Sequence, residues 1–492
     1  MSPTAFVGAS LTGFHSTAGT RKLPNPVPDS LTSRQPLSIF CFQALQPPLF
    51  LRPDGAQIMR LRQYLERLQS SGRLLTVANP VSRNLDAAAI LSEADERPVL
   101  FQKIRESEFR VAGNLFGTKK SFADSFGIEP SQLISKMVHA IENPTRPDPV
   151  SRPPCQEVVE TDVDLDRLPI LFHCAGDGGP YITSGVFVTR SRDGIQNVDF
   201  HRAMRIGRDR LSVRIVRQRD FDTLLNRDRT LPVAVCIGTG PNVLLAAATS
   251  VALGQNELEI ANTLEPLAVT KAMTFDAWIP ADCEFVLEGV VSLAERANEG
   301  PFVDLTGTYD IVRQEPVLRI TRITRRKDAI WHALLPGRGE HKMLMGMPRE
   351  PTLFREVERA GVRCLDVSVN PGGCSWLHAI LQIDKRHEAD GKKAIEAGFR
   401  GHKSCKHIFV VDGDVDIYNP LEVEWALATR FQADVDLVVR EREKGSSLDP
   451  SADPETSLTV KCGFDLTKPL GESAKRFERA AFPRCNLERF LK

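Results

Sequence analysis

The sequence lacks an excess of charge of either sign, long apolar runs and paired cysteines. Its 492 residues carry 63 basic and 63 acidic side chains, so no overall field draws the chain to nucleic acid or to an anionic membrane. No apolar run approaches the roughly 20 residues that cross a bilayer, so we expect no transmembrane segment. The ten cysteines include no C-x-x-C pair and no group at zinc spacing, which argues against disulfides or structural zinc and for a reducing, cytoplasmic setting.

Common nucleotide and metal motifs are absent as well. GTGPNV has Gly238 and Gly240 but no third glycine, and the chain contains neither a P-loop nor H-E-x-x-H. VDGDVDIYNP alternates acids like a calcium loop, yet Ile417 and Val423 stand where an EF-hand needs Gly and Glu. We therefore expect these acids to end a strand and to cap the next helix.

The N-terminal half changes character twice. Residues 1–58 are rich in Ser, Thr and Pro, and indicate an extension that is disordered or lies upstream of a true start at Met59. MRLRQYLERLQSSGRL then has the spacing of an amphipathic helix. Over residues 59–152, helical patterns such as LDAAAILSEAD mix with short strands such as PVLFQKI, which predicts an N-terminal α/β domain.

The remaining chain divides into a strand-rich part and an alternating part. Residues 153–330 follow a Pro-rich linker and contain many strand patterns, LPVAVCIG and CEFVLEGVVSL among them, with one helix, NELEIANTL. Strands at this density predict a barrel or rolled sheet. Residues 331–492 alternate helix and strand, which predicts a C-terminal α/β domain with a parallel sheet.

Polar residues of catalytic type are spread along the strand-rich part in the order Asn197, Arg202, Glu257, Glu299 and Asp304. The last two lie in ANEGPFVDLTG, where Gly300-Pro301 between them favours a turn followed by a strand over one helix face. Two such acids suit proton transfer, because a neighbouring charge can tune the pKa of each. Their alternative interpretation as ordinary turn residues stays open.

Several segments together carry a resemblance to a known family: DGGPYITSG, NVDFHRAMRIG, NELEIA, IPADCEFVLEG, NEGPFVDLTG and VDGDVDIYNPLEVEWALATRFQ. In this order and spacing, from about Met59 to the C-terminus, the chain resembles the UbiD family of decarboxylases. The resemblance implies an α/β architecture in three parts: an N-terminal α/β domain, a central split β-barrel of flavin-reductase type that holds the cofactor, and a C-terminal α/β domain. It also implies a homodimer or higher homo-oligomer.

The resemblance further implies the cofactors and the roles of individual residues. They are prenylated FMN, which a flavin prenyltransferase supplies, a divalent metal (Mn²⁺ or Mg²⁺) and, in many members, K⁺. Asn197 and Glu257 would bind the metal, with Asp220 or water as open choices for a third ligand. Arg202 would pair with Glu299 at the reactive edge of the flavin, and Asp304 would donate the proton. The residues expected to contact the cofactor are Thr183, Phe200, His201, Arg202, Arg214, Ile215, Val216 and Arg219.

The substrate is expected to be a small carboxylic acid. PGGCSWLHAI and KGSSLDPS most resemble the archaeal-type branch, which converts trans-anhydromevalonate 5-phosphate to isopentenyl phosphate and CO₂ in the modified mevalonate pathway of isoprenoid biosynthesis. Arg338, His341 and Lys342 are candidates to bind its phosphate, or belong to a solvated loop. An aromatic acid, 4-hydroxy-3-polyprenylbenzoate or a phenolic acid, is the alternative substrate. A metal-dependent hydrolase without flavin and a flavin-binding module without turnover are the alternatives from other classes.

Overall fold

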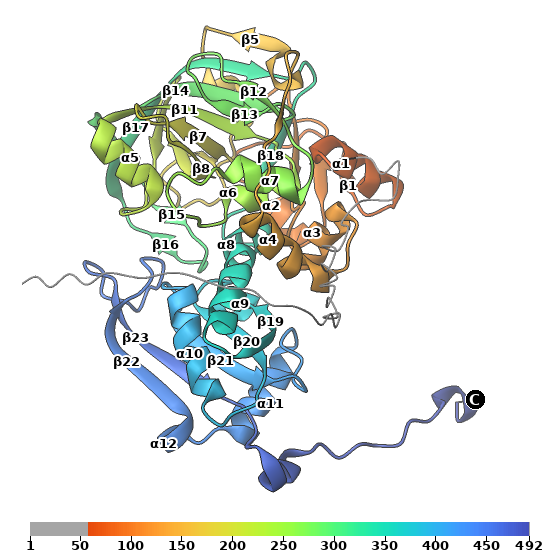
Figure 1. Ribbon diagram of the computed structural model, residues 1–492. Coiled ribbons are helices and arrows are strands. Elements are labelled where there is room, and N and C mark those ends of the chain that lie inside the picture. Colours follow the sequence, from red (N-terminus) through yellow and green to blue (C-terminus); the bar gives the residue numbers. More distant parts are fainter. Residues whose placement is uncertain (1–57, 492) are drawn as a thin grey trace, which may run out of the picture. The chain divides into compact units, whose positions relative to one another are not determined.

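The computed structural model describes residues 58–491, and its main compact unit is Gly55–Lys492 (Figure 1). The predicted extension, residues 1–58, therefore lies outside the described residues except for Ile58. Among the helices of residues 58–491, none is long and apolar enough to cross a membrane.

The first sheet is built from both ends of a long stretch of chain. The helix α1 (Leu61–Ser70) buries Leu61, Leu65 and Leu68, as its periodicity predicts. The four strands follow the order β1 (Leu75–Val77), β2 (Val99–Phe101), β3 (Arg110–Gly113) and β18 (Ile330–Ala333). The strand β18 runs parallel to β3, so the chain returns to this sheet more than two hundred residues later. Its helices are α2 (Asp86–Ala94), α3 (Lys119–Phe126) and α4 (Leu133–Glu142).

A nine-stranded sheet forms the centre, and every neighbouring pair in it is antiparallel. The order is β6 (Tyr181–Ile182), β9 (Ala203–Arg205), β10 (Arg210–Val213), β17 (Arg313–Arg325), β14 (Phe285–Glu299), β11 (Thr230–Ile237), β7 (Val186–Arg190) and β8 (Gln196–Phe200), with β5 (Val158–Glu160) beside β17. Register shifts along β14 bend the strands. At one of them, a Cβ on Gly289 would lie 2.0 Å from the carbonyl oxygen of Arg319, so only glycine fits. The sheet curls into a half-barrel, which confirms the predicted central fold.

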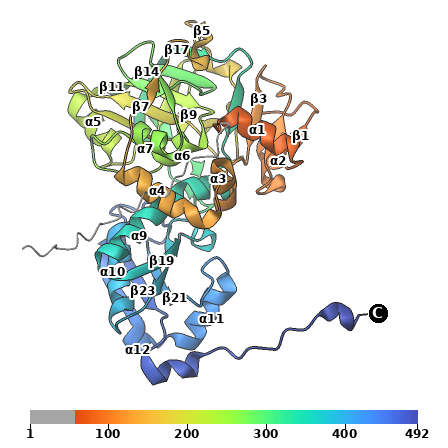
Figure 2. The same ribbon diagram turned by 45° about the vertical axis from the view of Figure 1, so that its right-hand side comes forward.

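The prediction of one helix in the strand-rich part is wrong. Three helices lie there: α5 (Asp220–Asp228), α6 (Pro241–Ala247) and α7 (Glu257–Leu264). The pattern concealed α6 because all seven of its residues are buried, which removes the polar face that helical periodicity requires. Both α6 and α7 lie against β8 and beside each other (Figures 1 and 2). A small sheet of β13 (Trp278–Pro280), β12 (Ala268–Lys271) and β4 (Asp148–Pro149) adjoins them, and β15 (Phe302–Val303) pairs with β16 (Tyr309–Asp310).

The C-terminal sheet is mixed, so the prediction of a parallel sheet is wrong. Its order is β19 (Arg363–Ser368), β20 (His378–Asp384), β21 (His407–Asp412), β23 (Leu458–Asp465) and β22 (Leu437–Lys444). The three middle strands are parallel, whereas both outer pairs are antiparallel. The helices are α8 (Gly339–Gly346), α9 (Glu350–Arg359), α10 (Asp390–Gly401), α11 (Pro420–Arg430) and α12 (Ala433–Asp436). Alternating elements alone do not reveal that outer strands turn back.

The acids of VDGDVDIYNP do end a strand, but they do not cap the next helix. Asp412 is the last residue of β21, and Asp412 and Asp414 bind the fully buried guanidinium of Arg430 at 3.0 and 2.8 Å. The side chain of Asn419 caps α11 by accepting a hydrogen bond from Leu421 N.

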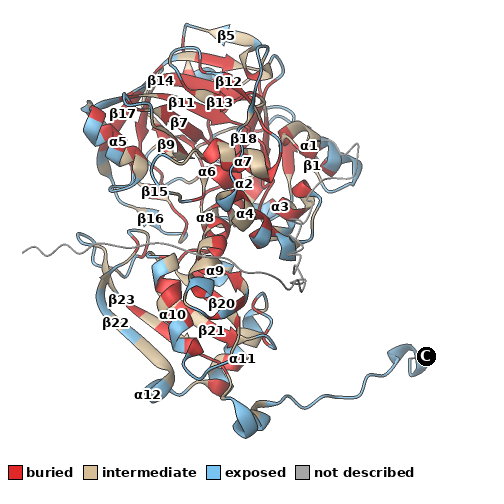
Figure 3. Ribbon diagram, in the orientation of Figure 1, coloured by how far each residue is buried: buried red, intermediate tan, exposed pale blue. Residues whose placement is uncertain are grey.

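Buried residues concentrate on the central strands β7, β11 and β14 (Figure 3). Because β7 and β11 carry almost no polar side chain, the polar residues that do enter the interior at β8 and at the end of β14 stand out as a candidate site.

Candidate active site

Arg202 is held by carboxylates from a distant part of the chain. It follows β8, and its Nε and Nη2 donate to the two oxygens of Glu299 at 2.9 and 3.0 Å in a bidentate pair. Its Nη1 also donates to Asp304 Oδ2. Arg202 and Asp304 are about nine-tenths buried and Glu299 completely so. The structure thus brings together the arginine and both acids of the predicted catalytic set.

A third carboxylate in this cluster was missed by the sequence analysis. Asp310 Oδ2, on β16, accepts from Arg202 Nη2 at 2.7 Å and lies 2.6 Å from Arg313 Nη1. Burial raises the pKa of Asp310, but the charges and hydrogen bonds of the two arginines outweigh it and leave that pKa below its usual range. The sequence analysis did not predict Asp310 because the segment GTYD is typical of a turn and lies outside the motifs that carry the family resemblance.

Tyr181 and two glycines fix the segment that carries Glu299. Tyr181 Oη donates to Glu299 Oε1 and accepts from Gly300 N, both at 3.0 Å. Gly178 N donates to Pro301 O at 2.7 Å, and a Cβ on Gly178 would lie 2.1 Å from the carbonyl oxygen of Gly300. The glycines of DGGPYITSG therefore allow NEGP to approach, which ties the two motifs into one structure.

Asn197 and Glu257, the expected metal ligands, lie next to each other. Glu257 begins α7, and its Oε2 accepts a hydrogen bond from Val198 N at 3.0 Å, one residue beyond Asn197 on β8. Both side chains are at least 95% buried. Burial and the nearby charges of Asp199 and Asp220 raise the pKa of Glu257 to about 8. Asp199 lies 3.0 Å from His201 Nε2 and the charge of Arg219 acts on Asp220, whereas Glu257 itself forms no ion pair with any residue of 58–491.

The donors present suit a hard divalent ion. Asn197 Nδ2 is buried and has no hydrogen-bond partner among residues 58–491; it is a donor, so only the amide oxygen of Asn197 could bind a cation. Amide and carboxylate oxygens are the ligands that Mn²⁺ and Mg²⁺ accept. Among residues 58–491, no group of three or more His, Cys, Asp or Glu has metal-binding geometry, so a site here depends on Asn197 and on water.

The residues predicted to contact the cofactor have varied surroundings. His201 Nδ1 lies 3.1 Å from Arg214 O and its Nε2 lies 3.0 Å from Asp199 Oδ1, while Arg214 Nη1 pairs with Glu315 Oε1 at 2.8 Å. Thr183 donates to Leu334 O at 2.6 Å. Of the others, Phe200 and Ile215 pack in the core, whereas Val216 and Arg219 are exposed. No ligand tests these contacts, and they stay predictions.

The three residues expected to bind a substrate phosphate do not form a cluster of free positive charges. Arg338 is exposed and donates to Ser92 Oγ at 2.7 Å. His341 Nδ1 accepts a hydrogen bond from Gly337 N at 3.0 Å, and burial lowers the pKa of His341, so its ring is neutral. Only Lys342 of the three has no such restraint, and the prediction stays untested.

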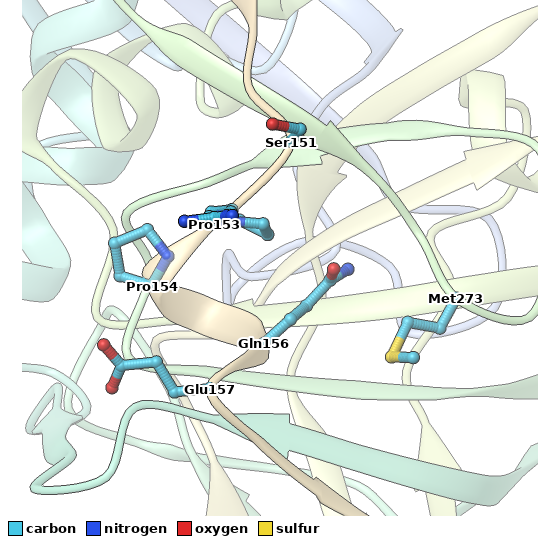
Figure 4. A pocket seen from close by; sticks show the side chains of 7 residues that line it. Ser151, Pro153, Pro154, Gln156, Glu157 and Met273 are labelled. Atoms are coloured by element: carbon cyan, nitrogen blue, oxygen red, sulfur yellow. The ribbon is translucent and has the colours of Figure 1, made fainter.

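A pocket of about 420 Å³ lies at the Pro-rich linker (Figure 4). Its lining residues are Ser151, Arg152, Pro153, Pro154, Gln156, Glu157 and Met273. None of them is a predicted site residue, so this pocket is separate from the Arg202 cluster.

Comparison with known proteins identifies the class. Family models described as parts of 3-octaprenyl-4-hydroxybenzoate carboxy-lyase match residues 65–141 (N-terminal domain), 148–339 (Rift-related domain) and 342–466 (C-terminal domain). The chain belongs to the UbiD family, as the sequence motifs predict.

Particular relatives are similar over nearly their whole length. A curated protein of Methanothermobacter thermautotrophicus, named anhydromevalonate phosphate decarboxylase, is 40% identical over 86% of this chain and 99% of its own. The solved UbiD-class enzyme HmfF of Pelotomaculum thermopropionicum, in complex with FMN, has a TM-score of 0.84 at 35% identity and covers 88% of this chain and 100% of its own. An evolved dimeric form of that enzyme in complex with prFMN has a TM-score of 0.81 at 33% identity and covers 88% and 100%. The UbiD-class fold is thereby established for this chain.

Proposed function

We propose that the protein decarboxylates anhydromevalonate phosphate, releasing CO₂ and isopentenyl phosphate, with prenylated FMN as cofactor. One observation carries the proposal: the Arg202–Glu299–Asp304 cluster is intact in a chain that is 40% identical to an anhydromevalonate phosphate decarboxylase across almost all of that relative. Similarity to an enzyme solved with FMN and prFMN supports the flavin.

Asn197 and Glu257 would hold a divalent metal, Mn²⁺ or Mg²⁺, with Asp220 or water as third ligand, and the metal, with K⁺, would help to bind the flavin. The contact of the Glu257 carboxylate with the backbone next to Asn197 and the burial of both residues support this assignment. Residues 214–216 and Arg219, together with Thr183, Phe200 and His201, line the flavin.

Loss of CO₂ leaves negative charge on an unsaturated carbon, and prenylated FMN supplies the electron sink that takes it. The protein's own residues orient the substrate and deliver a proton. Arg202 has few conformations available because Glu299, Asp304 and Asp310 occupy three sides of its guanidinium. It presents a fixed positive charge to the substrate carboxylate. Asp304 delivers the proton to the carbon that CO₂ leaves.

The remaining assignments follow from the family. The protein works as a homodimer or higher homo-oligomer in the cytoplasm and receives its flavin from a flavin prenyltransferase. Its domains run over residues 59–152, 153–330 and 331–492. These boundaries stay a prediction. Strands near both of them pair with strands of another predicted domain: β4 pairs with β12, and β18 pairs with β3.

The test is an assay of flavin-loaded protein, in which released CO₂ is measured with anhydromevalonate phosphate and with a panel of aromatic acids. Turnover of the phosphorylated acid, lost in Asp304→Asn with the flavin retained, is the expected result. Turnover of an aromatic acid alone would move the assignment to the other branch. Purified protein without flavin absorbance that hydrolyses esters would overturn it in favour of a hydrolase.

A further inference from the structure

Buried arginines in the described part of this protein generally sit against carboxylates, as Arg202 and Arg430 do. Arg349, which is half-buried, is different. It ends the short 3-10 helix Met347–Arg349 and occupies the N-cap position of α9. Over residues 58–491 no carboxylate lies within ion-pair distance of its guanidinium. The acid beside it in sequence, Glu350, is already taken by Lys119 at 3.2 Å and by Val369 N at 3.1 Å.

Most of the hydrogen-bonding capacity of Arg349 is unused. Its Nη1 donates to Ser250 Oγ at 2.5 Å, and its guanidinium lies 5.3 Å from the ring centre of Trp376. Its Nε is buried and has no partner among the described residues. A guanidinium has five N–H donors in a planar fork. One hydroxyl and one aromatic face leave this charge unbalanced, at a cost that a bound anion would remove.

The surroundings of Arg349 add positive charge. Burial and the charge of Arg219 together lower the pKa of Arg349 to about 10. Arg219 itself is exposed and forms no ion pair with any residue of 58–491. His402, on which the charge of Arg349 acts, has its pKa lowered by burial to about 3, so its ring adds no charge at neutral pH. The N-terminus of the ten-residue helix α9 contributes a further positive end.

We propose that Arg349, Ser250 and Arg219 form a binding site for a phosphate monoester. The fork of Arg349 matches two phosphate oxygens. Ser250 Oγ accepts a hydrogen bond from Arg349 and can donate its own O–H to a third phosphate oxygen, while Arg219 balances the second negative charge. Ser250 lies in the loop between α6 and α7, the helix that begins at Glu257. The inference deepens the proposed function, and two phosphates fit its chemistry: that of the flavin and that of the substrate.

The experiment compares Arg349→Gln with Arg355→Gln in the full chain. Arg355 lies on the same helix α9 but is paired with Glu142 at 2.9 Å, so it controls for loss of an arginine there. Binding of FMN and of riboflavin, which lacks the phosphate, is measured by flavin fluorescence, and binding of inorganic phosphate by calorimetry. Arg349→Lys, with its melting temperature, controls for folding because it keeps the charge.

If the site binds the flavin phosphate, Arg349→Gln weakens FMN binding at least 30-fold and leaves riboflavin binding unchanged. If it binds the substrate phosphate, FMN binding is unchanged, whereas inorganic phosphate binding is lost and KM for the phosphorylated acid rises at least 30-fold with kcat nearly constant. The inference is overturned if Arg349→Gln equals Arg355→Gln in every one of these measurements. The FMN, riboflavin and inorganic phosphate arms need no turnover, so they stand even if the proposed substrate is wrong.

Discussion

Two charged clusters of the central sheet are built on opposite principles. Around Arg202, one cation is surrounded by Glu299, Asp304 and Asp310, and Tyr181 supports one of these acids. Around Asn197, Glu257 forms no ion pair and Asn197 Nδ2 has no hydrogen-bond partner among residues 58–491. The first cluster is thus held together by contacts within the chain, whereas the second leaves a buried acid unpaired. The fold alone positions the Arg202 cluster, and we expect the Asn197–Glu257 cluster to depend on a bound ligand.

The largest effect should come from removing the centre of the balanced cluster. In Arg202→Ala, the buried Glu299 and Asp304 lose their counter-charge while Asp310 keeps Arg313, so we expect roughly 3–5 kcal/mol lower stability and at least about 1000-fold slower CO₂ release. Urea unfolding and single-turnover assays measure the two. Arg313→Gln, which removes only the outer partner of Asp310, should keep most of both. A stable, active Arg202→Ala protein would refute the view that this cluster is held together by its arginine.

The incomplete cluster should respond in the other direction. Glu257→Gln removes a carboxylate that crowds its neighbours, so the metal-free variant should be at least as stable as the wild type. A ligand at 100 times its Kd stabilises a protein by about 2.7 kcal/mol, and Mn²⁺ should do so for the wild type but not for the variant. Thermal melts with and without Mn²⁺ measure this difference. An equal Mn²⁺ effect on both proteins would place the metal elsewhere.

A smaller effect should come from a buried group that carries no charge. Burial, with the charges of Arg349, Lys461 and Arg219, lowers the pKa of His402 to about 3, and its Nε2 donates to Trp376 O at 2.8 Å. Because the unfolded ring titrates near pH 6.5, this contribution to stability is complete above pH 6.5 and is lost as pH falls toward 3. Between pH 6.5 and 5, the wild type should lose about 2 kcal/mol more than His402→Gln. Urea titrations at both pH values measure the difference, and parallel losses in the two proteins would contradict the assignment.

The smallest effect tests the support of the balanced cluster. Tyr181→Phe removes the hydroxyl between Glu299 and Gly300 N and should cost about 1–2 kcal/mol of stability, with a modest loss of kcat. Ser184→Ala, which cuts a bond to His332 O in the same segment, is the matched control. If kcat falls equally in both variants, the Tyr181 hydroxyl has no specific part in holding Glu299.

Structural elements and site residues can be predicted from the sequence where the hydrophobic pattern is periodic or where a segment matches a motif of the family. The helix at Leu61–Ser70 follows from its spacing, and Arg202, Glu299 and Asp304 follow from their motifs. Asp310 escaped because its pairing depends on the β15–β16 hairpin, which a turn-like segment does not reveal. Arg349 escaped because its importance is a missing partner, and only coordinates show what a side chain does not touch. Uniform burial concealed α6 in the same way.

The parallel pairing of β18 with β3 has a consequence for how the protein can be divided. The half-barrel is an insertion within the first sheet, because strands on both of its sides complete that sheet. A fragment that stops at residue 152 would leave the edge of β3 unpaired and open to association with other chains. During synthesis, the first sheet cannot be completed until Ala333 has been translated. The N-terminal strands therefore lack their last partner until the half-barrel has been synthesised.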